Sequence, residues 1–134
     1  MKGLLINKYI RKILIEQKEV TDLVDPRNIK ALILSPTSFP FISFQRGNIR
    51  PEYTKDGNVE DTVSVEVICV ANDYEQAVNI AQAVRETLEK HSYGVPKDNF
   101  LIKDMILKDS DEDQIEDVYV QSLYFDFLVT NITK

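Results

Sequence analysis

The segment from Thr62 to Ala71, TVSVEVICVA, constrains the fold more than any other feature of this sequence, because it alternates cleanly. Its apolar set is Val63, Val65, Val67, Cys69 and Ala71, and its polar set begins with Thr62, Ser64 and Glu66. Successive side chains of a strand point to opposite faces of the sheet, so the first set shares one face. The pattern predicts a half-buried antiparallel strand whose end, with Ile68 and Val70, is covered on both sides.

The residues after this strand predict a helix with a well-formed amino end. Asp73 precedes Gln76 by three residues, so its carboxylate is placed to accept from the backbone N–H of Gln76, and Gln76 is placed to reach back. The helix is expected over residues 74–90. Its buried stripe is predicted to be Ala77, Ile80, Ala81, Val84 and Leu88. We therefore interpret the acidic corner as a structural joint and not as a catalytic site.

The amino-terminal part of the chain predicts a second amphipathic helix. Apolar residues at spacings of three and four indicate a helix over residues 3–18. A short turn over residues 20–24 follows, with Thr21 as its cap. The pair Asp25-Pro26 ends this turn, because a residue before proline disfavours the helical conformation.

The remaining strands complete an α+β domain. They are expected over residues 29–34, 40–46, 100–107 and 118–129. The polar segment 47–61 is expected to be a long hairpin loop, and residues 108–117 an acidic turn. The order α-β-β-β-α-β-β predicts two helices on one face of a mainly antiparallel sheet of four to five strands. Residues 1–134 are expected to form a single domain.

Charge is distributed unevenly along the chain. Residues 1–50 hold nine Lys and Arg against four Asp and Glu, whereas residues 51–134 hold seven against eighteen. The basic part of one subunit is therefore able to meet the acidic part of a neighbour, as in a head-to-tail ring, although ordinary solvated charge is the alternative. A net charge of −6 argues against nucleic-acid binding that relies on neutralising phosphates. No apolar run is long enough to span a membrane.

The sequence offers no set of residues for catalysis, metal binding or a cofactor. Cys69 is the only cysteine and lies on the apolar face of its strand, and His91 is the only histidine. The acidic turn resembles the start of an EF-hand loop, but Gln114 and Val120 stand where that loop needs Gly and Glu. We do not expect an enzyme.

The segments together resemble a known family. A "VTDLV" turn and "RNI" follow the first helix, and "FPFISFQR" precedes the polar loop. The corner "ANDYEQAVNIAQAVRETL", the acidic turn and "VYVQSLYFDFLV" complete the pattern. In this order the chain resembles, over nearly its whole length, the phage tail-completion or tail-terminator family of long-tailed phages and prophages. The resemblance implies a structural protein without catalytic residues.

The resemblance also implies an assembly role. Such proteins form a ring, usually a hexamer, on the last ring of tail-tube protein, end tube elongation and dock to the head connector. DNA passes through the ring without specific binding. The resemblance places the protein in the bacterial host cytoplasm during assembly and in the virion tail afterwards.

Two surfaces are expected to carry the contacts of this role. Contacts to a neighbouring subunit or the tube are predicted for Arg46, Asn48, Arg50, Tyr53 and Lys55. Residues predicted to face a neighbour or the lumen, where they would repel DNA phosphates, are Asp109, Asp111, Glu112 and Asp113. The alternatives are another assembly protein of the head–tail junction, or a cytosolic ligand-binding or regulatory domain with a defined small pocket.

Overall fold

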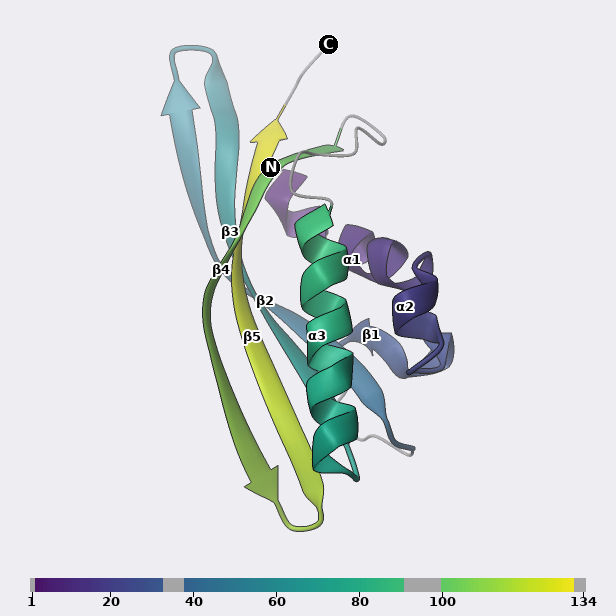
Figure 1. The fold of residues 1–134 in the computed structure, drawn as a ribbon. Helices are drawn as coiled ribbons and strands as arrows, with labels where there is room; N and C mark the ends of the chain where they lie inside the picture. The colour runs from purple at the N-terminus through teal and green to yellow at the C-terminus, as the bar shows by residue number, and fades with distance from the viewer. Residues whose placement is uncertain (1, 33–37, 91–99, 132–134) are drawn as a thin grey trace.

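A computed structural model describes residues 2–32, 38–90 and 100–131 and contains one twisted sheet covered on one face by helices (Figure 1). The helical segments are η1 (Lys2–Leu5, a 3-10 helix), α1 (Ile6–Ile15), α2 (Lys18–Thr21), η2 (Pro26–Asn28, a 3-10 helix) and α3 (Tyr74–Lys90). The strands are β1 (Ile29–Ala31), β2 (Phe41–Thr54), β3 (Gly57–Ala71), β4 (Phe100–Ile115) and β5 (Val118–Asn131). The α+β fold class predicted from the sequence is confirmed.

The sheet has the strand order β1-β2-β3-β5-β4. Only β1 and β2 are parallel, and the other neighbouring strands are antiparallel. Strand β3 is therefore the central strand, with β2 as its neighbour on one side and β5 on the other. Strand β4 forms one edge of the sheet, and the short β1 forms the opposite edge.

The core lies between β3, β5 and the helices, as the sequence predicts. The alternating apolar residues of β3, from Val63 to Ala71, are all buried. The buried residues of β5 on the same face are Leu123, Phe125, Phe127 and Val129. The predicted stripe of α3 is buried as well, and α1 contributes Ile6, Tyr9, Ile10 and Leu14. The sheet and both longer helices thus share one core.

The predicted loop over residues 47–61 is wrong. These residues continue β2 and begin β3, and the pairing runs from Phe41↔Val70 to Thr54↔Gly57. Only Lys55 and Asp56 lie between the two strands. Gly57 has a φ of 108°, a backbone conformation that glycine adopts without steric cost. The distal part of β2 shows no apolar alternation, because almost all of its side chains face solvent, so nothing in its pattern indicates a strand.

The predicted acidic turn over residues 108–117 is wrong for the same reason. Strand β4 continues to Ile115 and pairs with β5 as far as Ile115↔Val118. The turn consists of Glu116 and Asp117 alone. Two extra residues, Lys103 and Lys108, interrupt the register of β4 at β-bulges. The side chains of residues 109–117 are all exposed, so they too lack an apolar period.

The amino-terminal prediction needs smaller corrections. The helix expected over residues 3–18 is interrupted at Gln17, whose backbone is extended. Thr21 is not the cap of a turn, because it ends α2 and its hydroxyl donates to the Gln17 carbonyl at 3.3 Å. Asp25 instead caps η2 by accepting from the Arg27 backbone N–H at 2.8 Å. Strand β1 ends at Ala31, before Leu32 with its φ of 54°, and residues 33 and 34 lie outside the described residues.

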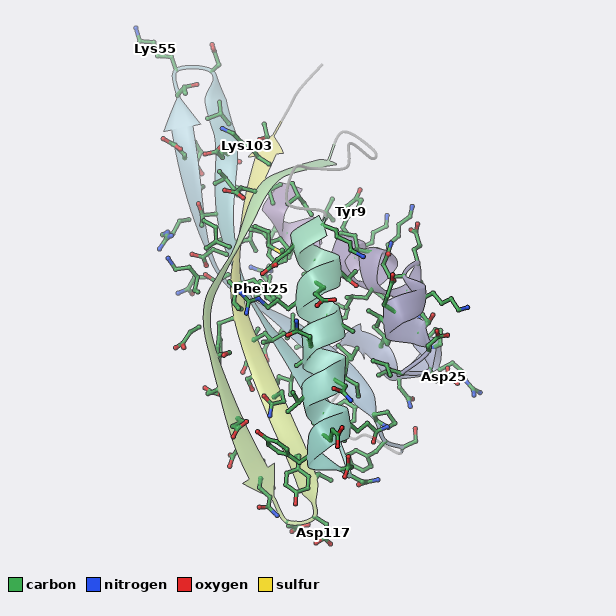
Figure 2. The ribbon with its side chains drawn as sticks, viewed as in Figure 1. Tyr9, Asp25, Lys55, Lys103, Asp117 and Phe125 are labelled. Carbon is green, nitrogen blue, oxygen red and sulfur yellow. The ribbon has the colours of Figure 1, made fainter. Side chains whose placement is uncertain are left out.

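The two long hairpins end at opposite ends of the molecule (Figure 1). Figure 2 labels Lys55 at the end of the β2–β3 hairpin and Asp117 at the end of the β4–β5 hairpin. The helices cover the middle of the sheet between these ends (Figure 1). The sheet therefore extends beyond the part of the molecule that its core stabilises.

A buried carboxylate ties the amino terminus to the central strand. Asp61 of β3 is fully buried, and its Oδ2 accepts from the Gly3 backbone N–H at 3.1 Å. A negative charge at the amino end of a helical segment is favourable, because the free N–H groups there are partly positive. This contact fixes the first helical turn where β3 passes from the core into the projecting hairpin.

We predict that Gly3→Ala destabilises the protein. An added Cβ would lie 2.8 Å from Val63 Cγ2 and 3.0 Å from Asp61 Oδ2, so the first turn would have to move. We expect a loss of about 1–3 kcal/mol in the free energy of unfolding, measured by urea denaturation. Gly47→Ala is the control, because its Cβ would meet nothing closer than 3.5 Å, and should change stability by no more than about 0.5 kcal/mol. Equal losses of unfolding free energy in both variants would contradict a stabilising role for the close contact between Gly3 and Asp61.

Candidate functional site

The predicted contact residues of the β2–β3 hairpin lie along β2 and in its turn. Tyr53 is 63% exposed, Arg50 is exposed, and Lys55 stands at the tip (Figure 2). Arg46 is only partly exposed, and its guanidinium donates to the Gly47 carbonyl at 3.4 Å. Asn48 lies at an irregularity in the pairing, between the pairs formed by Arg46 and Ile49. The structure thus brings the five residues onto one hairpin but does not gather them into one cluster.

This hairpin has mixed charge, which the sequence analysis overlooked. Glu52 and Asp56 stand among its basic residues, and Glu60 lies 3.5 Å from Lys103 of β4. Arg50 Nη2 lies 4.0 Å from Asp126 Oδ2, at the limit of an ion pair. The hairpin is therefore suited to polar contacts of both signs and not to one strongly acidic partner.

The predicted acidic residues of β4 fall on two faces of the sheet. Glu112 pairs with Gln121, on the face that the helices cover. Asp109, Asp111 and Asp113 alternate with it and lie on the opposite face. All four are exposed. They are a strip of separate carboxylates, and within residues 2–32, 38–90 and 100–131 no three His, Cys, Asp or Glu side chains are grouped so as to hold a metal ion.

Glu112 joins the acidic hairpin to the corner that begins α3. Its Oε1 accepts from Gln121 Nε2 at 2.9 Å and from the Tyr74 hydroxyl at 2.9 Å. These two donors, Gln121 first, hold the pKa of Glu112 below its usual value. The hydrogen bond to Glu112 raises the pKa of Tyr74, and the rings of Tyr74 and Tyr119 are nearly perpendicular, with their centroids 5.8 Å apart.

At the corner itself, the structure contains one of the two predicted capping contacts. The backbone N–H of Gln76 donates to Asp73 Oδ2 at 3.0 Å, which confirms the capping role of Asp73. The sequence did not indicate a role for Tyr74, whose hydroxyl connects this corner to the acidic hairpin through Glu112. Its proximity to Glu112 depends on the long β4, which the sequence does not reveal.

A groove of about 380 Å³ crosses the outer face of the sheet between the irregular parts of β2 and β4. Tyr124 lines it, and its hydroxyl donates to Asp111 Oδ2 at 3.2 Å. Burial, followed by the hydrogen bonds to Glu66 and Asp111, raises the pKa of Tyr124. Asp126, also in the groove, accepts from Ser64 Oγ at 3.0 Å. The charged residues that line this groove are two carboxylates, Glu66 and Asp126, and two cations, Arg46 and Lys108, so its formal charge is balanced.

A second groove, of about 400 Å³, lies at the β1 edge of the sheet, between α1 and β1. We call it the basic groove, lined by Asn7, Lys8, Arg11, Lys12, Ile15, Ala31 and Phe44. Arg11 is held in place because its Nε donates to the Ile29 carbonyl at 2.8 Å. The three cations at spacings of three and four were a visible signal of a basic helix face, but nothing in the sequence placed β1 beside it.

The remaining candidates for chemistry are inert or lie outside the described residues. Cys69 is buried, and burial raises the pKa of its thiol to about 12, so it is not a thiolate nucleophile at neutral pH. His91 lies outside the described residues. None of the helices in the described ranges has the length and apolar content that a bilayer crossing requires.

Known proteins share both the sequence pattern and the fold of this chain. The family model described as "Tail completion protein gp17" matches residues 8–130. A solved chain in the structure titled "Virion of native gene transfer agent (GTA) particle" aligns with a TM-score of 0.66 and 17% identity. The alignment covers 90% of this chain and 91% of that chain. No curated protein sequence matches.

We predict that Gln121→Leu raises the pKa of Glu112, because its amide is the main donor to that carboxylate. Tyr74→Phe removes the second donor and should raise the pKa by less. Carboxyl-carbon NMR titration of the folded protein measures both changes. Tyr53→Phe at the other hairpin is the control and should leave the Glu112 titration unchanged. A larger change in Tyr74→Phe than in Gln121→Leu would contradict this order.

Proposed function

Because this chain belongs to the Tail completion protein gp17 family, we propose that it caps the growing tail tube as a ring, ends its elongation and provides the head-docking surface. The chain is a structural component of a phage tail and not an enzyme. The family match over residues 8–130 carries the proposal, because it includes every strand of the sheet up to Thr130. We propose a hexamer for the assembled ring.

The shape of the molecule supports an assembly role. Both hairpins extend past the core, and the side chains of distal β2 and of residues 109–117 are exposed, whereas the facing residues 58–60 and 118–121 are partly buried. Ordering such a segment costs conformational entropy that a single subunit does not offset by burial. Contacts with other subunits would bury the same side chains, so the hairpins are the natural surfaces for assembly.

The β2–β3 hairpin is proposed to reach the tail-tube protein or a neighbouring subunit. Tyr53 supports this, because a largely exposed aromatic residue is the kind of side chain that interfaces bury. The mixed charges around it suit a partner surface with mixed charges. The fold likeness to a chain of a gene transfer agent virion supports placing such a subunit in an assembled particle.

The acidic residues of β4 are proposed to face a neighbouring subunit or the lumen of the ring. Asp109, Asp111 and Asp113 on the outer face would repel DNA phosphates, so DNA would slide through the ring without specific binding. The head connector is the proposed partner on the side away from the tube. Assembly is proposed to occur in the cytoplasm of the bacterial host.

Deletion of the gene from its phage or inducible prophage tests the proposed role. Without a cap, tube subunits keep adding and heads find no docking surface. We expect electron micrographs to show overlong tails beside separate, filled heads, with normal particles restored by the wild-type protein supplied from a plasmid. Particles with tails of normal length joined to heads would remove the chain from this role.

Shortening the β2–β3 hairpin tests its contact role. Replacing Glu52–Glu60 with an Asn-Gly turn retains the Pro51↔Asp61 pair and the buried Asp61 contact. We expect an unfolding temperature close to that of the wild type, but loss of joined particles when the variant complements the deletion. The control variant keeps the full hairpin and replaces only Lys55-Asp56 with Asn-Gly. Full complementation by the shortened variant would exclude the hairpin from the interface.

A further inference from the structure

We propose that the acidic tip of one subunit docks into the basic groove of the next. The acidic tip is the end of the β4–β5 hairpin, residues 109–117. This inference rests on the proposed ring and identifies the contact that would hold neighbouring subunits together. Its partner is a second copy of this chain, bound through two different surfaces.

The basic groove has the composition of a docking site for an acidic segment with one apolar side chain. Ile15 and Ala31 are partly buried beside the fully buried Phe44, and together they give the groove an apolar floor. Lys8 and Lys12 are exposed at its rim. Helix α1 contains three basic residues and no acidic residue between Ile6 and Ile15, and Glu16 follows at its carboxyl end.

The acidic tip has the complementary composition. Residues 109–117 contain six Asp and Glu and no Lys or Arg. Ile115 is 55% exposed at the last position of β4. Burying the exposed part of Ile115 against an apolar floor lowers the free energy of the complex. The carboxylates beside Ile115 match a cationic rim.

One subunit does not bring its own tip and groove together. The groove lies at the β1 edge of the sheet, and β4, which carries the tip, is the opposite edge (Figure 1). When one tip binds the groove of another subunit, the resulting pair still has one free tip and one free groove. A further copy is therefore able to add at either end. Such head-to-tail contacts close into a ring when the rotation between subunits divides a full turn.

The groove on the outer face of the sheet fits the acidic tip less well. In that groove the carboxylates of Glu66 and Asp126 stand beside the cations of Arg46 and Lys108, so its formal charge is balanced, whereas the basic groove, among the described residues, has cations and no carboxylate in its lining. Charge therefore selects the groove between α1 and β1.

Disulfide cross-linking tests the contact directly, because the only native thiol, Cys69, is buried. The double variant I115C/K12C is assembled on tail tubes and oxidised. We expect disulfide-linked multimers on non-reducing gels, and none from I115C/R85C, whose second cysteine lies on an exposed part of α3. Rings that form but give no I115C/K12C link would overturn the tip–groove contact and leave the proposed function intact.

Charge reversal provides the second readout. K8E/K12E and D113K/E116K/D117K should each lose ring assembly while keeping the wild-type unfolding temperature, and the five changes combined should restore rings. Failure of the combined variant, or rings from either partial variant, would overturn the contact. Rings from K8E/K12E that fail to retain DNA would assign the groove to nucleic acid instead. Wild-type protein that forms no ring on tubes would overturn the proposed function and this contact together.

Discussion

The burial of one face of β3 is the constraint on which the rest of the structure depends. This strand pairs with β2 from Gly57 to Val70 and with β5 from Glu60 to Ala71, and its apolar face lies under the helices. Because side chains alternate along a strand, that face fixes the register of both neighbours: a slip by one residue would turn Val65 and Phe125 toward solvent. The helices, the hairpins and the positions of both grooves follow from this register.

The sequence predicts the structure of an element when one face of that element is buried. It gives no signal when both faces of the element are exposed. The alternation of β3, the stripe of α3 and the Asp73 cap are local patterns with a direct physical cause, and each is confirmed. The distal hairpins carry residues such as Tyr53 and Glu112, which face solvent, so no apolar period marks them as strands. Their strands are held by backbone pairing, which side-chain patterns do not report.

Surfaces built from distant segments are the other part that the sequence does not contain. The basic helix face was visible at Lys8, Arg11 and Lys12, but the floor beside it comes from Ala31 and Phe44. Likewise, Glu112 and Tyr74 are 38 positions apart and meet only because β4 is long. The uneven charge along the chain does not separate the two signs throughout the fold, because Lys103 and Lys108 lie on β4 and Arg50 Nη2 lies 4.0 Å from Asp126 Oδ2.

The bulges at Lys103 and Lys108 have a consequence for how this molecule behaves before assembly. An open edge strand as long as β4 would otherwise template pairing with any exposed strand, which leads to irreversible fibrous aggregates. An extra lysine at two points along β4 breaks the row of backbone donors and acceptors and adds charge to the edge. Non-specific association of subunits through backbone hydrogen bonds along β4 is then disfavoured. Recognition is left to side chains, so free subunits are able to remain dispersed in solution.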